Sequence, residues 1–331
     1  MKRLALCHTP TPLWHHPALD ALVGCELWVK RDDMTSGAAA GNKIRKLEYL
    51  MADALAHGAT AVITCGGLQS NHARATALVA RELGLSPVLL LRTKDPSAAQ
   101  PLTGNLLLDR LVGADVRLIT PDQYRARAEL MAELSAELAA RGEVPYVIPE
   151  GGSNGLGSFG YVAAVEELME QQAAGDLPPD VDLLAVACGS GGTAAGVALG
   201  LGRCPSVARR VAAFAVCDDR AYFEDAIAGI VQEARALDET LPPPALLEIY
   251  DEFKGPAYGV ASAEQLEFVS RVARACGLVL EPTYTGKALF GLSRLRDKPS
   301  RALFVHTGGL PGLLADGEVM AAAWARAAVG A

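Results

Sequence analysis

The sequence predicts an α/β protein with mostly parallel sheets wrapped by helices. Short runs of β-branched and aliphatic residues alternate with longer segments of helical periodicity along almost the whole chain, a pattern typical of parallel sheets. Composition agrees, because 50% of the 331 residues are hydrophobic. That is enough to bury a substantial core in one large domain or two of ordinary size.

The expected strands alternate with expected helices along almost the whole chain. They are ELWVK from Glu26, TAVITC from Thr60, PVLLL from Pro87, DVRLIT from Asp115, PYVIP from Pro145, VDLLAVA from Val181, RVAAFAV from Arg210 and RALFVH from Arg301. In open parallel sheets, ligands bind beyond the carboxyl ends of the strands. The strand-to-helix junctions after Cys65 and Ala187 are therefore the expected positions of a binding site.

A helix is expected to begin near Asn42, which would be its N-cap. Apolar residues recur at helical spacing over 44–55, and Gly58 ends the segment. Lys43 then lies in the first turn, where the helix dipole disfavours a cationic amine and so favours one able to attack a carbonyl. Spacing alone does not choose between Lys43 and Lys46.

Two stretches interrupt the alternation of strands and helices. EGGSNGLGSFG, from Glu150, carries five glycines and is a candidate domain crossing or ligand loop. LPPPALLEIYDEFKGPAYG, from Leu241, is rich in proline and is expected to be a non-helical excursion.

Charge and cysteine usage exclude several classes of protein. A net charge of -8 and a pI near 5.3, with no basic run, disfavour a nucleic-acid partner. The seven cysteines form no CxxC pair and no metal-ligand spacing, so we expect reduced core thiols and no metal. The start, MKRLALCHTPTPLW, is too poor in apolar residues for a signal peptide, and no segment is long enough to span a membrane. A soluble cytoplasmic protein is expected.

Four hydrogen-bonding residues meet in GGLQSNHAR, namely Gln69, Ser70, Asn71 and His72. They lie between an expected strand and an expected helix. Ser or Asn there could simply cap the helix. The same helix end could also bind an anion, because it presents free amides and a partial positive charge. Both interpretations stay open at this point.

The second junction, ACGSGGTAAG, can cradle a phosphate. Its turn is Gly189, Ser190, Gly191, Gly192 and Thr193. Glycines let the backbone approach an anion closely with successive N–H groups, and the two hydroxyls add donors.

Phosphate binding alone leaves the ligand open. Gly189, Gly191 and Ala194 also fit the GxGxxA fingerprint, with Asp218 or Asp219 as the ribose-binding acid. A nicotinamide-dependent dehydrogenase is therefore an alternative. EPTYTGKAL lacks the leading glycine and the final Ser or Thr of a Walker loop, so no nucleoside triphosphatase is indicated.

Six segments together resemble one family of pyridoxal-phosphate (PLP) enzymes, the D-cysteine desulfhydrases and 1-aminocyclopropane-1-carboxylate (ACC) deaminases. They are GNKIRKLEYL, GGLQSNHAR, ACGSGGTAAG, AYGV, EPTYTGKAL and FVHTGGLPGL. The resemblance implies the two-domain fold type II architecture, which is tryptophan synthase β-like. Residues 1–46 and 153–331 would form the large PLP-binding domain, and residues 47–152 a small inserted α/β domain. It also implies a homodimer.

The resemblance implies a role for each matched residue. Catalytic roles fall to Lys43, which would bind the cofactor covalently, and to Ser70, Tyr258 and Tyr284. The cofactor contacts would be Lys43, Asn71, Gly189, Ser190, Gly191, Gly192, Thr193, Tyr284 and Thr307, with Asn71 at the 3-hydroxyl and Thr307 at the pyridine nitrogen. The substrate contacts would be Ser70, Asn71, His72 and Tyr258, with the Ser70 to His72 cluster receiving the substrate carboxylate.

Two positions favour the desulfhydrase branch. ACC deaminases have Glu where this chain has Thr285, and Gln where it has His72. A carboxylate at the pyridine nitrogen would keep that nitrogen protonated and make the cofactor ring a strong electron sink, whereas the neutral hydroxyl of Thr307 cannot. A weaker sink still suffices when a β-substituent leaves as the α-proton is removed. Ala194 departs from the branch, whose members have His there.

The expected reaction is the conversion of D-cysteine to pyruvate, ammonia and sulfide. The alternatives within the family are ACC deaminase and L-cysteate sulfo-lyase. From other classes, a nicotinamide dehydrogenase and a non-catalytic protein that binds a cofactor or an amino acid stay open.

Overall fold

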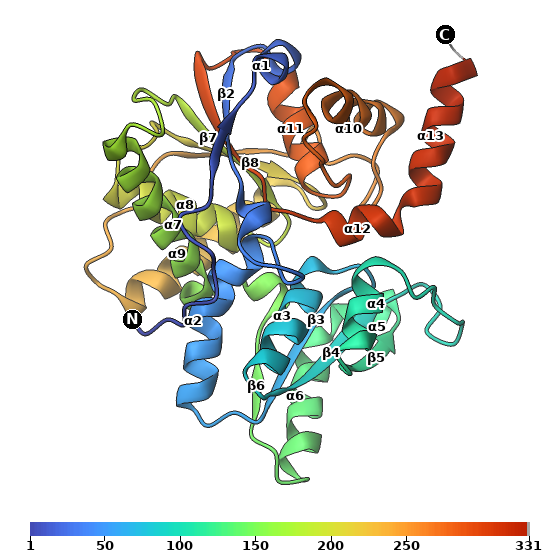
Figure 1. The fold of residues 1–331 in the computed structure, drawn as a ribbon. Helices are drawn as coiled ribbons and strands as arrows, with labels where there is room; N and C mark the ends of the chain where they lie inside the picture. Colours follow the sequence, from blue (N-terminus) through green and yellow to red (C-terminus); the bar gives the residue numbers. More distant parts are fainter. Residues whose placement is uncertain (330–331) are drawn as a thin grey trace.

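The computed structural model describes residues 1–329 and contains two sheets surrounded by helices (Figure 1). The larger sheet has the order β1-β2-β10-β7-β8-β9 and the smaller one β5-β4-β3-β6. Every pair is parallel except β1 with β2. The strands are β1 (Leu13–His15), β2 (Glu26–Lys30), β3 (Ala61–Gly67), β4 (Ser86–Arg92), β5 (Asp115–Ile119), β6 (Pro145–Val147), β7 (Leu183–Cys188), β8 (Val211–Ala215), β9 (Leu247–Tyr250) and β10 (Arg301–Val305).

Helices cover both faces of the sheets, as parallel strands require. The α-helices are α1 (Pro17–Val23), α2 (Asn42–Ala56), α3 (Asn71–Glu82), α4 (Gly104–Leu111), α5 (Pro121–Arg125), α6 (Arg127–Ala139), α7 (Gly155–Ala174), α8 (Gly192–Arg203), α9 (Arg220–Leu237), α10 (Ala263–Cys276), α11 (Thr285–Arg294), α12 (Leu310–Ala315) and α13 (Gly317–Val329). Two short 3-10 turns are η1 (Asp32–Met34) and η2 (Glu150–Gly152).

The expected fold class is confirmed, and each strand expected from the sequence is present. Two edge strands of the larger sheet, β1 and β9, were not expected. β9 lies within the proline-rich segment that was correctly expected to be non-helical. Both strands are short and bond to one neighbour only, so their sequences carry little of the buried pattern that marks a central strand.

The smaller sheet lies entirely within residues 47–152, the expected inserted domain. Helix α2 crosses the expected boundary at Leu47 and packs against α7. A side chain at Gly160 on α7 would lie 2.3 Å from the carbonyl oxygen of Arg45, so only glycine allows this approach. The exact domain boundaries stay a prediction.

The start of α2 differs from the sequence expectation. Gly41 is the N-cap, with φ of 127°, and Asn42 is the first helical residue. The Asn42 side chain does not cap the helix because it donates instead to Thr193 Oγ1 on α8, at 3.1 Å. Asn42 therefore ties the helix that carries Lys43 to the second strand-to-helix junction.

A buried ionic cluster fixes α2 against η1 and α7. Arg45 donates to both oxygens of Asp32, at 2.9 and 2.8 Å, and to Glu167 Oε2 at 2.9 Å. Tyr161 also donates to Asp32, at 2.6 Å. Breaking one partner of such a buried set is costly, so the first turn of α2 is held rigidly.

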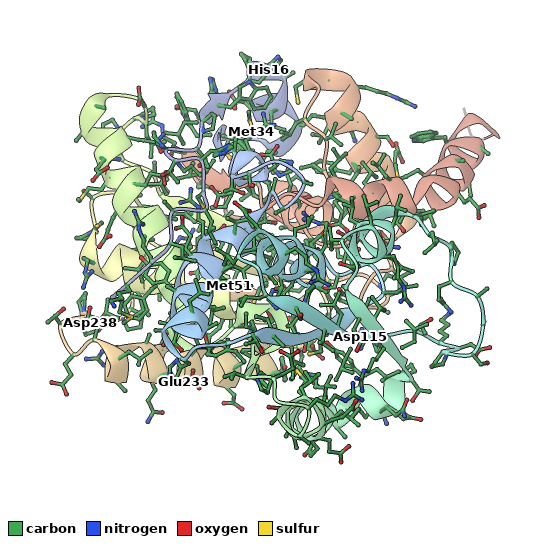
Figure 2. The ribbon with its side chains drawn as sticks, turned by 60° about the horizontal axis from the view of Figure 1, so that its bottom comes forward. His16, Met34, Met51, Asp115, Glu233 and Asp238 are labelled. Carbon is green, nitrogen blue, oxygen red and sulfur yellow. The ribbon has the colours of Figure 1, made fainter. Side chains whose placement is uncertain are left out.

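The helix faces follow the usual division between buried and exposed residues. Met51 on α2 is fully buried, whereas Glu233 lies on the exposed side of α9 (Figure 2). Within residues 1–329, no helix combines the length and the apolar character that crossing a membrane would require.

Candidate active site

A cavity of about 620 Å³ lies where the carboxyl ends of strands from both sheets face each other. Gly67 and Arg92 reach it from β3 and β4, and Cys188 from β7. Every residue that the sequence analysis placed in the site lines this cavity except Gly192. The Gly192 amide instead donates to Ser153 Oγ, at 3.3 Å, behind the cavity wall.

The two lysines at the start of α2 have different surroundings. Lys43 lines the cavity, and burial lowers the pKa of its amine to about 8, although the Glu150 carboxylate partly opposes this shift. Lys46 is 1% exposed, and its amine donates to Gly151 O and Ser153 Oγ, both at 3.1 Å. Only Lys43 presents its amine to a ligand. Burial is the first cause of its lowered pKa.

The glycine turn between β7 and α8 forms an anion site. The amides of Ser190, Thr193 and Ala194 have no acceptor in the described part of the chain, and they lie at the positive end of α8. Gly191 has φ of 83°, which favours glycine. A side chain at Gly189 would lie 2.9 Å from Tyr284 Cε1. The turn fits a phosphate group.

A hydrogen-bonded chain supports this turn from behind. Lys46 donates to Ser153 Oγ, which lies 2.8 Å from Ser190 Oγ. Lys46 thus positions the anion-binding turn, although it does not line the cavity.

The N-terminus of α3 provides a second anion site. Ser70 is the N-cap, and its Oγ accepts from the Ala73 amide at 3.1 Å, so its hydroxyl proton is free for a ligand. The amides of Asn71 and His72 have no acceptor in the described chain. Asn105 donates to Asn71 Oδ1, at 3.1 Å, which leaves the Asn71 NH₂ group as a donor. Helix capping and anion binding therefore coexist at Ser70.

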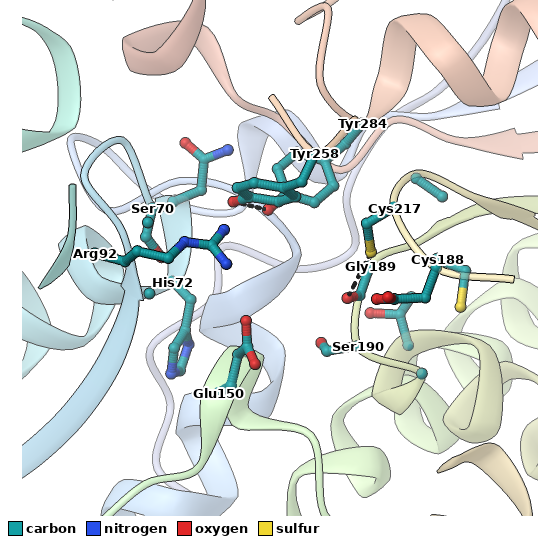
Figure 3. A pocket seen from close by; sticks show the side chains of 18 of the residues that line it. Ser70, His72, Arg92, Glu150, Cys188, Gly189, Ser190, Cys217, Tyr258 and Tyr284 are labelled. Carbon is teal, nitrogen blue, oxygen red and sulfur yellow. Dashed lines mark hydrogen bonds between the residues drawn. The ribbon is translucent and has the colours of Figure 1, made fainter. Parts of the chain in front are cut away.

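His72 lines the cavity, but its ring nitrogens do not point into it (Figure 3). Nε2 lies 2.9 Å from Thr64 Oγ1, whose own proton goes to Ile148 O, so Nε2 is the donor. Nδ1 is buried without a partner. Burial, and then the charges of Lys43 and Lys46, hold the pKa of His72 well below its usual value. In this arrangement His72 can offer an anion its backbone amide but not its ring.

Two tyrosines bridge the two junctions. Tyr258 packs against Gly67 and Tyr284 against Gly189, and their hydroxyl oxygens are 2.7 Å apart (Figure 3). Burial raises the pKa of Tyr258 to about 12 and holds that of Tyr284 well above its usual value. Both hydroxyls are therefore protonated at neutral pH. One donates to the other, which leaves one proton for a ligand.

The two threonines used to choose a branch have different positions. Thr307 lines the cavity next to α2, and its carbonyl oxygen accepts from the Asn42 amide at 3.1 Å. Thr285 is fully buried and does not line the cavity. Its Oγ1 accepts from the Glu281 amide, at 2.9 Å, and so closes the turn before α11.

Sequence reasoning missed part of the cavity wall. Arg92, Tyr124 and Arg127 line it, and Arg127 forms a 3.1 Å ion pair with Glu150. Glu150 begins the glycine-rich stretch that was expected to be a domain crossing or ligand loop, and most of that stretch is the start of α7. Arg92 is the last residue of β4, one of the expected strands. Its place at the carboxyl end of a parallel strand could have indicated that it lines a binding site.

The cavity is thus lined by the Lys43 amine, by two anion sites and by a pair of protonated tyrosines. Residues 1–329 contain no group of three or more His, Cys, Asp or Glu side chains that could hold a metal ion. The arrangement suits a phosphorylated cofactor that reacts with an amine, together with a small substrate that carries a carboxylate.

Comparisons with known proteins agree with this chemistry. The family model "Pyridoxal-phosphate dependent enzyme" matches residues 4–308. The chain is 44% identical over 326 residues to the mitochondrial bifunctional D-cysteine desulfhydrase/1-aminocyclopropane-1-carboxylate deaminase of Arabidopsis thaliana, covering 93% of this chain and 78% of that protein. It is 40% identical to a D-cysteine desulfhydrase of Klebsiella pneumoniae, with 95% of each covered. The crystal structure of an ACC deaminase homologue superimposes with a TM-score of 0.88 at 34% identity, covering 98% of this chain and 96% of that one.

The fold and the cavity together define an enzyme that uses a phosphorylated cofactor. The chain belongs to the family of pyridoxal-phosphate-dependent enzymes, with the fold type II architecture. This membership sets aside the nicotinamide dehydrogenase. Asp219, one candidate for the ribose-binding acid, accepts from the Tyr222 amide at 2.9 Å as the N-cap of α9.

Proposed function

We propose that the protein is a PLP-dependent lyase that converts D-cysteine to pyruvate, ammonia and sulfide by α,β-elimination. The observation that carries this proposal is that Lys43 lines one cavity together with two anion sites, the glycine turn of α8 and the N-terminus of α3. One site suits the cofactor phosphate, and the other suits the carboxylate of an amino acid. The names of the relatives from Arabidopsis thaliana and Klebsiella pneumoniae support the choice of substrate.

Pyridoxal phosphate, when bound, supplies an aldehyde that links to amines and a ring that takes up electrons from the substrate's α-carbon. Lys43 would hold it covalently, and the free amides of Ser190, Thr193 and Ala194 would hold its phosphate. The free NH₂ group of Asn71 is a suitable donor for the 3-hydroxyl. By resemblance, Thr307 faces the pyridine nitrogen.

The remaining residues bind the substrate and move protons. The Ser70 hydroxyl and the two free amides of α3 would bind the carboxylate. Once the substrate's amino group has replaced Lys43 on the cofactor, the released Lys43 amine, with a pKa of about 8, can take the α-proton near neutral pH. The proton left free on the Tyr258 and Tyr284 pair can form a hydrogen bond to the departing sulfur.

We also propose a cytoplasmic location and a homodimer. All seven cysteines are free, which supports a reducing compartment. The homodimer is supported by the family resemblance, and sedimentation at several protein concentrations would test it.

The activity is tested by measuring products from four substrates. Sulfide and pyruvate should form from D-cysteine faster than from L-cysteine, sulfite from L-cysteate should be slower, and 2-oxobutanoate from ACC should be slowest. Faster turnover of ACC than of D-cysteine would identify a deaminase instead. Elimination from none of the β-substituted amino acids would refute the proposed reaction.

The site of attachment is tested by borohydride reduction and tryptic mapping. Arg45 separates the two candidates, so a label on Lys43 appears in the peptide 32–45 and a label on Lys46 in the peptide 46–74. We expect the label in the first peptide. Lys43→Ala should lose the visible absorption of the cofactor, whereas Lys46→Met, which keeps a buried stem, should keep the label on Lys43. A label on any other lysine would refute the assignment.

A further inference from the structure

Arg92 presents a cation to the cavity, and none of the proposed steps described above involves it. It ends β4 and is paired in register with Gly67 at the end of β3. Its guanidinium points into the cavity toward the tyrosines (Figure 3). Among the residues that the structure describes, no carboxylate lies within ion-pair distance of it, whereas the neighbouring Arg127 is paired with Glu150.

Two aromatic rings fix the position of this cation. The Arg92 guanidinium carbon lies 4.6 Å from the centre of the Tyr124 ring and 5.4 Å from that of Tyr258. Such stacking orients a guanidinium while leaving its N–H groups free to bind another ligand. Tyr124 is itself held by Arg127, whose guanidinium carbon lies 5.0 Å from the ring centre. The cation is therefore built into the wall of the cavity and does not extend freely into solvent.

The substrate carboxylate has donors of its own and does not need Arg92. The Ser70 hydroxyl and the free amides of Asn71 and His72 already form a complete carboxylate site. Arg92 instead stacks on Tyr258, whose hydroxyl bonds to Tyr284. It belongs to the tyrosine side of the cavity, where the group on the β-carbon departs in the proposed reaction.

We propose that Arg92 is the specificity-determining residue for the β-substituent, and that it selects a sulfur group that is anionic or becomes anionic as it leaves. This inference rests on the proposed elimination. In that reaction the Lys43 amine takes the α-proton. The electron pair of the broken Cα–H bond then forms the double bond between the α- and β-carbons, and the carbon–sulfur bond breaks. The sulfur departs with the bonding electrons, as hydrosulfide from a thiol or as sulfite from a sulfonate, and water hydrolyses the unsaturated amine to pyruvate and ammonia.

Arg92 would act on the charge that collects on the sulfur. A guanidinium binds oxyanions through two parallel N–H groups and also stabilises a thiolate electrostatically. Chloride needs little help, because it leaves readily as a stable anion. Substrates that share the same amino-acid part but differ in the leaving group therefore isolate the contribution of Arg92.

The test compares Arg92→Gln with the parent enzyme on D-cysteine, L-cysteate and both enantiomers of β-chloroalanine. Gln keeps hydrogen-bonding capacity but loses the charge. We expect kcat/KM to fall about 10-fold or more with the sulfur substrate that the parent uses, the scale of one hydrogen bond to a charged group. With β-chloroalanine it should fall by less than about threefold. The separate arms for D-cysteine and L-cysteate show whether a thiol or a sulfonate is the natural group.

Arg92→Lys is the matched control, because it keeps the charge but not the planar fork. Its loss with sulfur substrates should be smaller than that of Arg92→Gln and still larger than its loss with β-chloroalanine. Visible cofactor absorption and melting temperature show whether Arg92→Gln is folded. If it is not, Arg92→Lys tests the role of Arg92 by itself. Competitive inhibition by methanesulfonate gives a readout without turnover, and it should weaken in both variants.

Two results would overturn the role of Arg92. An equal loss with all substrates would mean that Arg92 acts on the part they share, such as the carboxylate. No loss with any of them would mean that the cation does not reach the substrate. A parent enzyme that eliminates from none of the substrates, including β-chloroalanine, would instead refute the proposed function itself.

Discussion

Two variants can separate the two roles of Ser70, which are to cap α3 and to bind the substrate carboxylate. Its Oγ accepts from the Ala73 amide, at 3.1 Å, and its proton is free for the substrate carboxylate. Ser70→Ala removes both interactions. Ser70→Gly removes the same hydroxyl, but glycine is tolerated at an N-cap. Alanine at this position should therefore cost about 1 kcal/mol of stability, and glycine only a few tenths.

The effect on the substrate should be the same in both variants. A hydrogen bond to a charged group contributes about 1.5 to 3 kcal/mol, so its loss should raise KM roughly 10- to 150-fold. Elimination itself should slow only modestly, because the bond exists before and after the reaction step.

Steady-state kinetics on D-cysteine and thermal melting measure the two effects independently. We expect equal increases in KM, with a larger fall in melting temperature in Ser70→Ala than in Ser70→Gly. A fall in kcat of ~100-fold or more in both variants would show that Ser70 moves a proton during catalysis. Unchanged kinetics in both variants would exclude carboxylate binding and proton transfer by Ser70.

Two further predictions concern the cavity wall and the turn before α11. Gly189→Ala would place a methyl group 2.9 Å from Tyr284 Cε1, so it should displace the ring and weaken cofactor retention on dialysis; retention at the parent level would contradict this packing. Burial raises the pKa of Glu281 to about 7 from a usual value of 4.5, so the folded state binds more protons between these values and stability should fall as pH rises from 4.5 to 7. Glu281→Gln should flatten this decline in urea unfolding at pH 5 and pH 8, and an unchanged slope would exclude Glu281 as its cause.

The sequence predicted the elements that have a strong local signal. Central strands of a parallel sheet are buried on both faces, and their apolar runs are therefore easy to recognise. The two junctions could be predicted as binding sites because several glycines and small hydroxyl residues directly after a strand exceed what packing a turn requires. The roles of these residues were supplied by the family resemblance, and the structure brings them to one cavity.

The elements and residues that were missed depend on tertiary contacts. Asn42 has the composition of an N-cap, but it bonds to Thr193, which is 151 residues away. Arg92 carries no motif, and its importance comes from its register with Gly67 and from two tyrosines on other segments. The orientation of the His72 ring depends on Thr64 and Ile148 in the same way. Local sequence can place a residue type at a helix end, but it cannot show where the side chain points.

The position of Thr285 changes the argument for the desulfhydrase branch. Its hydroxyl closes the turn at Glu281, and the residue is fully buried outside the cavity lining. Thr285 therefore stabilises a turn here, whereas Thr307 lines the cavity and, by resemblance, faces the pyridine nitrogen. A threonine hydroxyl has no charge with which to hold a proton on the ring nitrogen, so the bound cofactor would be a moderate electron sink. A moderate sink favours substrates whose β-group departs with the electrons. Among the described residues Arg92 has no carboxylate partner and lies beside the tyrosine pair, so the role proposed for it is compatible with such a departure.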